Sequence, residues 1–130
     1  MPYIDWPIIL AGDFNCVMDG SWDRDPPRKD TKPNMLAALG LLMKHFTFKN
    51  VWRDTNSDKR ECTCLTPGYT THSRLDRFLM SEDIAVVTDS IMHQDRYLSD
   101  HAPVVLQLNR GGTRPKAPLW RLRPDALKDR

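Results

Sequence analysis

Two short acidic turns carry the residue types that could do chemistry in this chain. One turn holds Asp13 and Asn15, and the other holds Asp100 and His101. Taken alone, each turn is more often a cap or a bend than a functional site. Both turns, however, directly flank a short apolar run that is typical of a strand. Because polar groups at strand ends commonly carry chemistry, we treat the two turns together as the candidate site.

A third carboxylate, Asp76, stands inside another apolar stretch of the sequence. An unpaired buried carboxylate costs several kcal/mol, so Asp76 needs a partner. His101 is the partner that we favour, because a carboxylate that accepts from one ring nitrogen fixes the tautomer and leaves the other nitrogen for a substrate. The alternative is an ion pair of Asp76 with Arg74 or Arg77 on a solvated strand.

The remaining polar groups of the two turns suit a metal ion and a phosphate. Asp13, Asn15 and Asp100 provide hard oxygen ligands and an amide, the composition that holds Mg²⁺ and a phosphate together. Hydrolysis of a phosphodiester needs a nucleophilic water and a stabilised leaving oxygen. The candidate residues have the functional groups for both requirements.

The elements that must position these side chains are mostly strands. Alternating or continuous apolar residues predict strands, apolar residues at three- and four-residue steps predict a helix, and Pro67-Gly68 predicts a turn. Residues 19–30 are rich in turn formers and predict a surface loop, and residues 48–53 predict a strand or a loop. The other expected elements are a buried strand over 7–12, a helix of about a dozen residues after Lys32, a hairpin around Pro67-Gly68, strands over 74–80, 91–97 and 102–108, and a short helical turn from Ser81 to Val87.

The composition describes a single folded domain. A chain of 130 residues is too short for two ordinary domains, and its 40% hydrophobic and 28% charged residues exclude a collagen-like or wholly disordered protein. The longest uncharged stretch near the start, residues 6–12, is far below the roughly 20 residues that span a bilayer, and no secretory signal is recognisable. No membrane partner is therefore expected.

The cysteines indicate a reducing, intracellular compartment. There are three of them, and Cys62 and Cys64 are separated by one residue, which does not suit a disulfide framework. A zinc site would need Cys62, Cys64, His72 and His45 as ligands. Their spacing matches none of the usual paired-ligand patterns, so zinc is a minor alternative.

The positive charge is confined to the C-terminal segment. Residues 110–130 hold 7 of the 19 Lys and Arg residues but 2 of the 17 Asp and Glu residues, which leaves 12 basic against 15 acidic residues in 1–109. This segment also contains three prolines and two glycines, which predict a linker. A cationic linker can contact nucleic-acid phosphates, or it can be a solvated tether.

Three motifs, in this order, resemble the last three signature motifs of the endonuclease/exonuclease/phosphatase superfamily. They are residues 12–15 (Gly-Asp-Phe-Asn), 73–81 (Ser-Arg-Leu-Asp-Arg-Phe-Leu-Met-Ser) and 99–104 (Ser-Asp-His-Ala-Pro-Val). Within that superfamily the chain most resembles the apurinic-like endonuclease of non-LTR (LINE-type) retrotransposon polyproteins, which have a similar run to Leu-Trp-Arg-Leu at 119–122. The basic run favours this branch over relatives that cleave phosphoinositides or sphingomyelin.

The resemblance implies an α/β (α+β) fold and a division of the chain. Residues 1–109 would be the C-terminal half of the domain, and residues 110–130 would be the basic linker. This half would contribute a mixed sheet with a flanking helix to a four-layer α/β-β/α sandwich. The preceding half of the family domain, with an early Asn, the principal metal-binding Glu and an active-site Tyr, has no counterpart in this sequence.

The resemblance also implies an activity: Mg²⁺-dependent hydrolysis of DNA phosphodiesters, with Mn²⁺ as an alternative metal. Asp13 would position or deprotonate the attacking water, and Asn15 and His101 would contact the scissile phosphate. Asp76 would orient His101, and Asp100 would lie at the metal. The hairpin over 62–73 would face DNA, with Thr71, Ser73 and Arg74 as the expected contacts.

Several further expectations follow from the missing half. The chain alone would have impaired activity and would expose an apolar sheet face, so it would be marginally stable or would associate with itself or with a complementary half. Expected partners are DNA, that N-terminal half and the reverse-transcriptase module of a parent polyprotein, in the nucleus when the enzyme acts on DNA. The alternative from another functional class is a non-catalytic remnant of a mobile element that binds nucleic acid weakly through residues 110–130.

Overall fold

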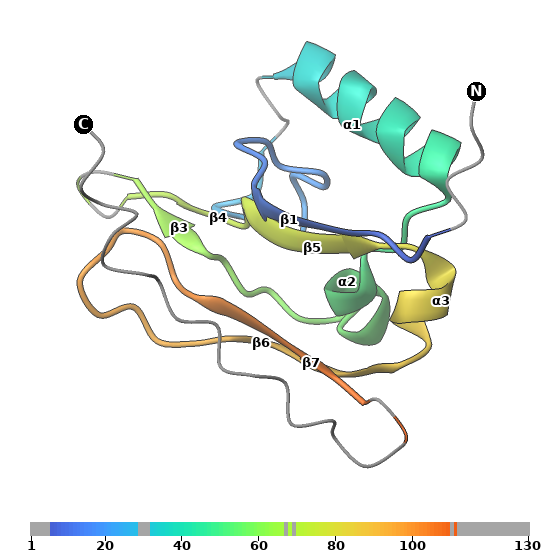
Figure 1. The fold of residues 1–130 in the computed structure, drawn as a ribbon. Helices are drawn as coiled ribbons and strands as arrows, with labels where there is room; N and C mark the ends of the chain where they lie inside the picture. Colours follow the sequence, from blue (N-terminus) through green and yellow to red (C-terminus); the bar gives the residue numbers. More distant parts are fainter. Residues whose placement is uncertain (1–5, 29–31, 67, 69, 110, 112–130) are drawn as a thin grey trace, which may run out of the picture.

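The computed structural model describes residues 6–28, 32–66, 68, 70–109 and 111. Apart from residue 111, the expected linker over 110–130 lies outside this part of the chain. The elements are β1 (Ile9–Asp13), β2 (Arg24–Asp25), α1 (Pro33–Phe46), α2 (Val51–Thr55), β3 (Cys64–Leu65), β4 (His72–Ser73), β5 (Asp76–Met80), α3 (Glu82–Ala85), β6 (Thr88–His93) and β7 (Val104–Leu108). Helix α1 lies on one side of the β1–β5 pair, and the β6–β7 pair lies on the other side (Figure 1).

The β1–β5 pair brings two candidate carboxylates side by side. The strands are antiparallel, with Ile9 opposite Met80 at one end and Asp13 opposite Asp76 at the other. Because side chains of directly opposed residues lie on the same face of a sheet, this register brings Asp13 and Asp76 together.

Helix α1 covers the core and confirms the helix predicted after Lys32. It runs from Pro33 to Phe46, and the proline lies in the first turn, where its missing N–H is not needed. Thr47 follows as the C-terminal cap in a left-handed conformation. Leu39 is buried in a cluster with Cys16, Phe48 and Leu79. Met35, in the first turn of the helix, is 43% exposed and lies outside this cluster.

Two further sheets complete the fold. The predicted hairpin is present as β3 and β4, which pair antiparallel and are extended by β2. Strand β6 begins at Thr88 and ends at His93, earlier at both ends than the expected 91–97. It ends opposite Val104, because the preceding residue of the partner segment is Pro103, which has no N–H to continue the ladder.

Three local expectations were wrong. Four of the five residues of β1 are exposed, so it is not a buried strand, and Ile9 and Ala11 lie open on the face away from the core cluster. Residues 51–55 form helix α2, while the strand character predicted for 48–53 is limited to an isolated bridge between Lys49 and Met80. All strand pairs among the described residues are antiparallel, so the expected mixed sheet is not seen there.

The α+β class is confirmed by these three antiparallel sheets and three short to medium helices. The four-layer sandwich remains a prediction. Within the described part of the chain, none of the helices combines the length and apolar character that crossing a membrane requires.

Candidate functional site

The turn after β1 presents Asp13 at the surface. Gly12 has φ +150°, a backbone conformation that residues with a side chain rarely adopt, and Asn15 has φ +49° in the left-handed region that asparagine tolerates. The backbone N–H of Asn15 donates to Oδ1 of Asp13 at 2.7 Å, which folds the turn back on itself. Asp13 is exposed at the end of its strand, and its carboxylate keeps acceptor capacity for further ligands.

Asp76 and His101 form a hydrogen-bonded pair. Nδ1 of His101 lies 2.8 Å from Oδ2 of Asp76, and the two side chains are 31% and 20% exposed. The expected partner of Asp76 is therefore the observed one. The hydrogen bond that His101 donates to Asp76 raises the pKa of His101 above its usual value, an effect that partial burial opposes.

Hydrogen bonds to the backbone position this pair. Oγ1 of the fully buried Thr63 accepts from the backbone N–H groups of Leu75 and Asp76 at 3.0 and 3.1 Å, and the backbone N–H of His101 donates to Oγ of Ser99 at 3.0 Å. The backbone N–H of Ala102 donates to the carbonyl of Thr63 at 2.6 Å. Thr63 thus connects the start of β5 to the segment that carries His101.

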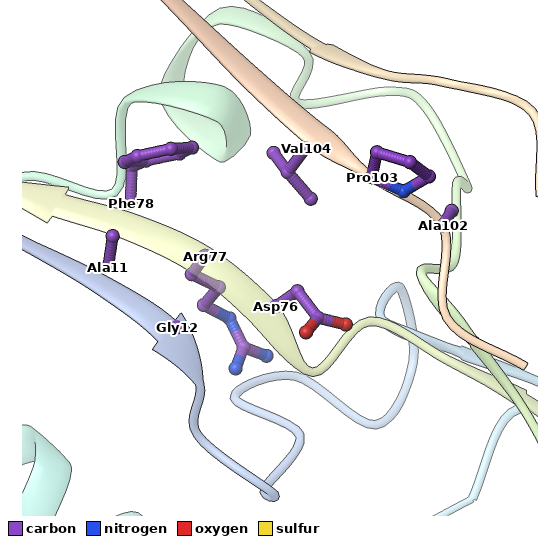
Figure 2. Close-up of a pocket in the computed structure, with 8 residues that line it drawn as sticks. All are labelled: Ala11, Gly12, Asp76, Arg77, Phe78, Ala102, Pro103 and Val104. Atoms are coloured by element: carbon purple, nitrogen blue, oxygen red, sulfur yellow. The ribbon is translucent and has the colours of Figure 1, made fainter. Parts of the chain in front are cut away.

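A groove leads away from the pair between β5 and the start of β7. It has a volume of about 340 Å³, and its lining is apolar along most of its length (Figure 2). Asp76 projects into it close to Ala102 and Pro103 (Figure 2). The carboxylate therefore lies where a bound molecule could reach it.

Asp13, Asp76 and His101 converge on one point of this surface. Each offers one ligand atom, and the three atoms lie within 4.8 Å of one another. Two carboxylates with hard oxygen donors and one imidazole suit a divalent cation such as Mg²⁺ or Mn²⁺. By the chemistry of its donors the set fits the metal that the sequence resemblance implies.

Asn15 lies at the same edge, with a neighbour that the sequence did not indicate. Nζ of Lys32 donates to Oδ1 and to the backbone carbonyl of Asn15 at 2.7 and 2.8 Å. This contact adds a positive charge next to an amide that is a candidate phosphate ligand. No local pattern predicts it, because the two residues are 17 positions apart and meet only through the path of the intervening loop.

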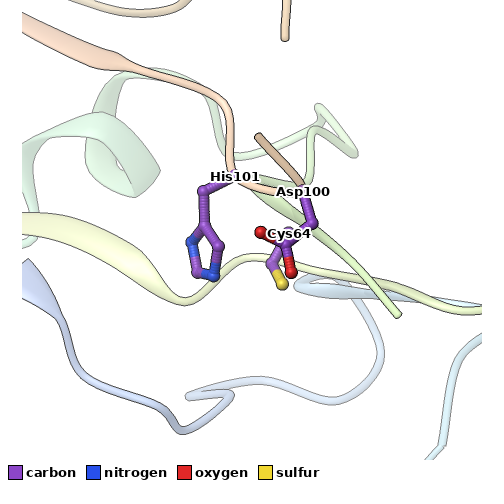
Figure 3. Close-up of side chains that lie close together, drawn as sticks. All are labelled: Cys64, Asp100 and His101. Atoms are coloured by element: carbon purple, nitrogen blue, oxygen red, sulfur yellow. The ribbon is translucent and has the colours of Figure 1, made fainter. Parts of the chain in front are cut away.

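Asp100 and Cys64 form a second group of possible ligands with His101. Their ligand atoms and one of the imidazole nitrogens lie within 4.8 Å of one another, and Figure 3 shows the three side chains pointing toward a common point. Burial, and then the nearby charges of Asp100, Asp76 and Asp13, raise the pKa of the Cys64 thiol. The zinc set considered from sequence, Cys62 with Cys64, His72 and His45, does not come together among the described residues.

The expectation that Arg74 and Ser73 contact DNA is not supported by their environment. The Arg74 side chain is 1% exposed, and its Nε and Nη2 donate to the Asp23 carboxylate at 2.8 and 3.1 Å. Ser73 is 7% exposed within the three-stranded sheet. Thr71 is partly exposed and bonds across the hairpin to Thr66, so of the three it alone presents surface.

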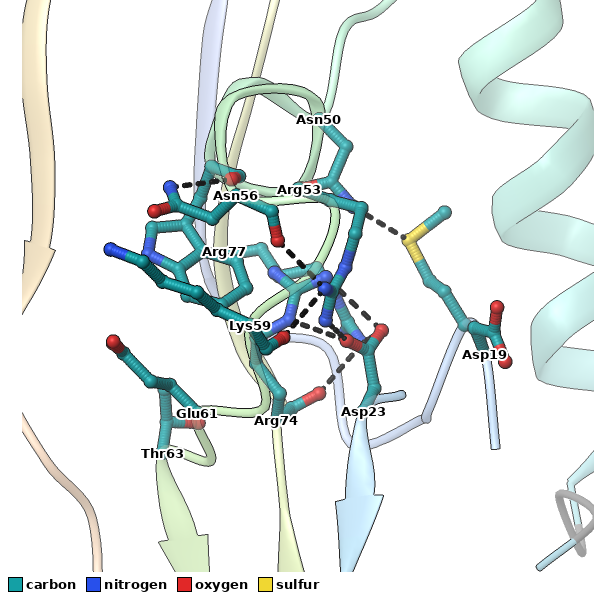
Figure 4. A network of polar contacts seen from close by, with 12 residues as sticks. Asp19, Asp23, Asn50, Arg53, Asn56, Lys59, Glu61, Thr63, Arg74 and Arg77 are labelled. Carbon is teal, nitrogen blue, oxygen red and sulfur yellow. Dashed lines mark hydrogen bonds and ion pairs between the residues drawn. The ribbon is translucent and has the colours of Figure 1, made fainter. Parts of the chain in front are cut away.

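Arg74 belongs to a buried charge cluster of Asp23 with three arginines, Arg53, Arg74 and Arg77 (Figure 4). Burial by itself would raise the pKa of Asp23, but the hydrogen bond and charge of Arg74 and the hydrogen bond from Arg53 lower it overall. Burial, followed by the charge of Arg74, lowers the pKa of Arg77 to about 10. Arg74 and Arg77 therefore pair with Asp23 rather than with Asp76, which removes the alternative of a solvated ion pair between Asp76 and either of them.

Comparison with known proteins relates the chain to a transposon protein. No protein-family model matches the chain. It is 30% identical over 127 residues to the Transposon TX1 uncharacterized 149 kDa protein of Xenopus laevis, with 96% of this chain and 10% of the relative covered. The chain thus spans about a tenth of the length of this curated relative. Because nearly the whole chain aligns, the similarity extends beyond the three motifs to α1 and to most of residues 110–130.

Proposed function

We propose that this chain is the C-terminal half of a metal-dependent DNA endonuclease domain of the endonuclease/exonuclease/phosphatase type, carried by a retrotransposon protein. The convergence of Asp13, Asp76 and His101 is the observation that carries the proposal. These residues come from three segments of the chain, yet their ligand atoms lie within 4.8 Å of one another. Similarity to a transposon protein along nearly the whole chain supports the same origin.

Asp76 and His101 would act together on the scissile phosphate. Asp76 accepts from Nδ1 of His101 and leaves the other ring nitrogen for the substrate. The raised pKa of His101 increases the protonated fraction near neutral pH, in which both ring nitrogens are donors. His101 would then donate a hydrogen bond to a phosphate oxygen and stabilise the charge that develops there.

Asp13 and Asn15 would serve the attacking water and the phosphate. One oxygen of Asp13 accepts from the Asn15 backbone, and the carboxylate is exposed, so it can accept a proton from a water or orient it for in-line attack. The side chain of Asn15 would donate its amide hydrogens to the phosphate while Lys32 holds its oxygen. A divalent cation held by Asp13, Asp76 or Asp100 would add Lewis-acid stabilisation of the phosphate charge.

A plasmid-nicking assay tests the proposal. Supercoiled DNA is incubated with the chain and Mg²⁺, and the rate of conversion to nicked circles is compared with those of Asp13→Ala and His101→Ala. We expect both variants to lose at least about 100-fold in rate, in the range of general acid–base and electrostatic contributions. Asp58→Ala and His45→Ala are matched controls, because both side chains are exposed and lie in neither ligand group. Equal rates for all five proteins would remove the catalytic assignment.

The alternative function is binding without cleavage. The basic excess of residues 110–130 favours salt-dependent contacts with nucleic-acid phosphates. Deletion of these residues would then abolish DNA binding measured at low salt, while Asp13→Ala would leave it unchanged. Binding of this kind together with an absence of nicking would identify the chain as a non-catalytic remnant of a mobile element.

A further inference from the structure

His101 belongs to two groups of possible ligands, one with Asp13 and Asp76 and the other with Cys64 and Asp100. In the first group Nδ1 is engaged by Asp76 at 2.8 Å. In the second group the other ring nitrogen points toward the Cys64 sulfur and the Asp100 carboxylate (Figure 3). The second group contains a sulfur, an imidazole nitrogen and a carboxylate oxygen, a donor set different from the oxygen-rich group at Asp13.

We propose that Cys64, Asp100 and His101 form a binding site for a thiophilic divalent cation such as Zn²⁺, which differs in its donor atoms from the oxygen-rich group of Asp13 and Asp76 and shares His101 with it. The three ligand atoms lie within 4.8 Å of one another. In a tetrahedral zinc site, Zn–S and Zn–N or Zn–O bonds of about 2.3 and 2.1 Å put neighbouring ligand atoms about 3.4–3.6 Å apart. Small side-chain rotations therefore suffice to close the site around an ion.

The backbone holds the three ligands in place before any ion binds. Cys64 and His101 form an isolated antiparallel bridge, and the N–H of Leu65 donates to the carbonyl of Asp100 at 2.9 Å. These contacts join strand β3 to the segment before β7, although the two segments are far apart in the sequence. Cys64 is partly buried and Asp100 is exposed, so the site lies at the surface and is open to solvent on one side.

The Asp76–His101 hydrogen bond completes the arrangement. Histidine ligands of zinc usually donate their second N–H to a carboxylate, which fixes the tautomer and makes the coordinating nitrogen more basic. Asp76 occupies that position. The carboxylates of Asp13, Asp76 and Asp100 attract a cation to this point, and the cation must displace the thiol proton, because burial and these same charges raise the pKa of the Cys64 thiol. Coordination requires the Cys64 thiolate, and the thiol proton passes to the buffer.

Three protein ligands leave one position of a tetrahedral ion for water or another ligand. An ion bound by Cys64, Asp100 and His101 would engage the ring nitrogen of His101 that, in the proposed function, contacts the phosphate. Zn²⁺ and a phosphate would then compete for His101. The site therefore has the properties of an inhibitory metal site, and its occupancy can be measured whether or not the chain cleaves DNA.

The test is a Zn²⁺ titration of the 130-residue chain by calorimetry, in excess Mg²⁺ so that the oxygen-rich group does not contribute. We expect one equivalent of Zn²⁺ to bind. Asp76→Asn removes an outer carboxylate partner, and we expect it to weaken Zn²⁺ binding by about 10–100-fold. Cys64→Ser removes a direct ligand, so we expect it to weaken Zn²⁺ binding by more than about 100-fold. Cys62→Ser is the matched control and should bind as the unaltered chain does, since its sulfur is in neither ligand group.

A Co²⁺ titration supplies a second measurement. The thiolate of Cys64 should give a sulfur-to-cobalt charge-transfer absorption that disappears in Cys64→Ser and persists in Cys62→Ser. Asp100→Asn is a second variant that keeps the test valid if Cys64→Ser does not fold. Because Asp100 is exposed, we expect Asp100→Asn to fold. Its Zn²⁺ affinity should be at least about 10-fold lower than that of the unaltered chain. Unchanged affinity in folded Cys64→Ser or in Asp100→Asn, or an absence of Zn²⁺ binding to the unaltered chain, would overturn the proposal.

Discussion

Two groups of charged side chains, which share the segment around β5, have opposite environments. Around Asp23, the side chains of Arg74 and Arg77 are buried and that of Arg53 is 19% exposed, and all three pair with the Asp23 carboxylate (Figure 4). Arg77 also donates to the carbonyl oxygens of Cys16 and Arg74. The paired side chains of Asp76 and His101 are partly exposed, and Asp76 lines the groove. Arg74 and Arg77 thus belong to one group, while Asp76, which lies between them in the sequence, belongs to the other.

The difference separates charged groups that are paired inside the protein from charged groups that keep the capacity to bind a ligand. A buried ion pair loses its hydration and must replace it with internal partners, so its groups have little capacity left for a ligand. The Asp13, Asp76 and His101 group keeps solvent-facing acceptors and one free ring nitrogen, which is the capacity that binding requires. Strong charge pairing therefore argues against Arg74 as a DNA contact and for Asp76 as part of a site.

The largest effect is expected from Asp23→Asn. It leaves three arginines without their common carboxylate, and breaking a buried pair costs about 3–5 kcal/mol, a large part of the stability of a small domain. Urea or thermal denaturation followed by circular dichroism measures the loss. Asp13→Asn is the matched control, and we expect it to change the free energy of unfolding by less than about 1 kcal/mol because Asp13 is exposed. An equal loss of unfolding free energy in the two variants would contradict the distinction between the Asp23 cluster and the exposed Asp13.

The same cluster predicts sensitivity to acid. The pKa of Asp23 is lowered in the folded chain from its ordinary value of 3.8. Its ionised form therefore stabilises the fold above pH 3.8, and this contribution is lost as the pH falls through the lowered folded pKa. The free energy of unfolding, measured by urea titration at several pH values, should decrease below pH 3.8 in the unaltered chain. Asp23→Asn should show a smaller decrease over that range.

The next largest effect is expected on activity rather than stability. Asp76→Asn removes the carboxylate that orients His101, and the loss of such a partner costs about 10–100-fold. The nicking rate should fall by this factor, while the free energy of unfolding should change by no more than about 1 kcal/mol, since the pair is partly exposed. A loss of stability as large as that of Asp23→Asn would show that Asp76 has a structural role instead.

A smaller and more specific effect is expected on the titration of His101. Its pKa is raised mainly by the hydrogen bond that it donates to Asp76, so Asp76→Asn should lower it toward 6.5, as measured from the imidazole chemical shifts by NMR. Because the folded pKa is raised, the pair stabilises the fold fully below about pH 6.5 and loses this contribution as the pH rises through the folded value. The His45 resonance provides an internal control, and an equal shift at both histidines would contradict a local origin.

The smallest effect is expected at the surface pair of Lys49 and Glu82, whose side chains are 42% and 68% exposed at a distance of 3.8 Å. Lys49→Ala should change the free energy of unfolding by less than about 0.5 kcal/mol, because solvent screens an exposed ion pair. Thermal unfolding at low and high salt measures it. A loss of several kcal/mol would mean that this exposed ion pair stabilises the fold as much as the Asp23 cluster does, which would contradict the comparison.

Much of the local structure could be predicted from the sequence. The apolar spacing after Lys32 predicted α1, Pro67-Gly68 predicted the hairpin, and Ser81 predicted the start of α3. Helix α2 was missed because it has only five residues, too few to show a period. The exposure of β1 was missed because an apolar run does not reveal whether a neighbouring layer covers it, and Ile9 and Ala11 are not covered here.

The sequence by itself determined which chemical groups are present and that an interior carboxylate required a partner. The pairing of Asp76 with His101 could be predicted because a partly buried charge has few favourable partners. The tertiary structure decided what no spacing specifies: that Arg74 and Arg77 pair with Asp23, that Lys32 meets Asn15, and that Cys64 lies beside His101. These contacts depend on how strands and loops from distant parts of the chain pack, and hydrophobic periodicity carries no information about which polar side chains that packing brings together.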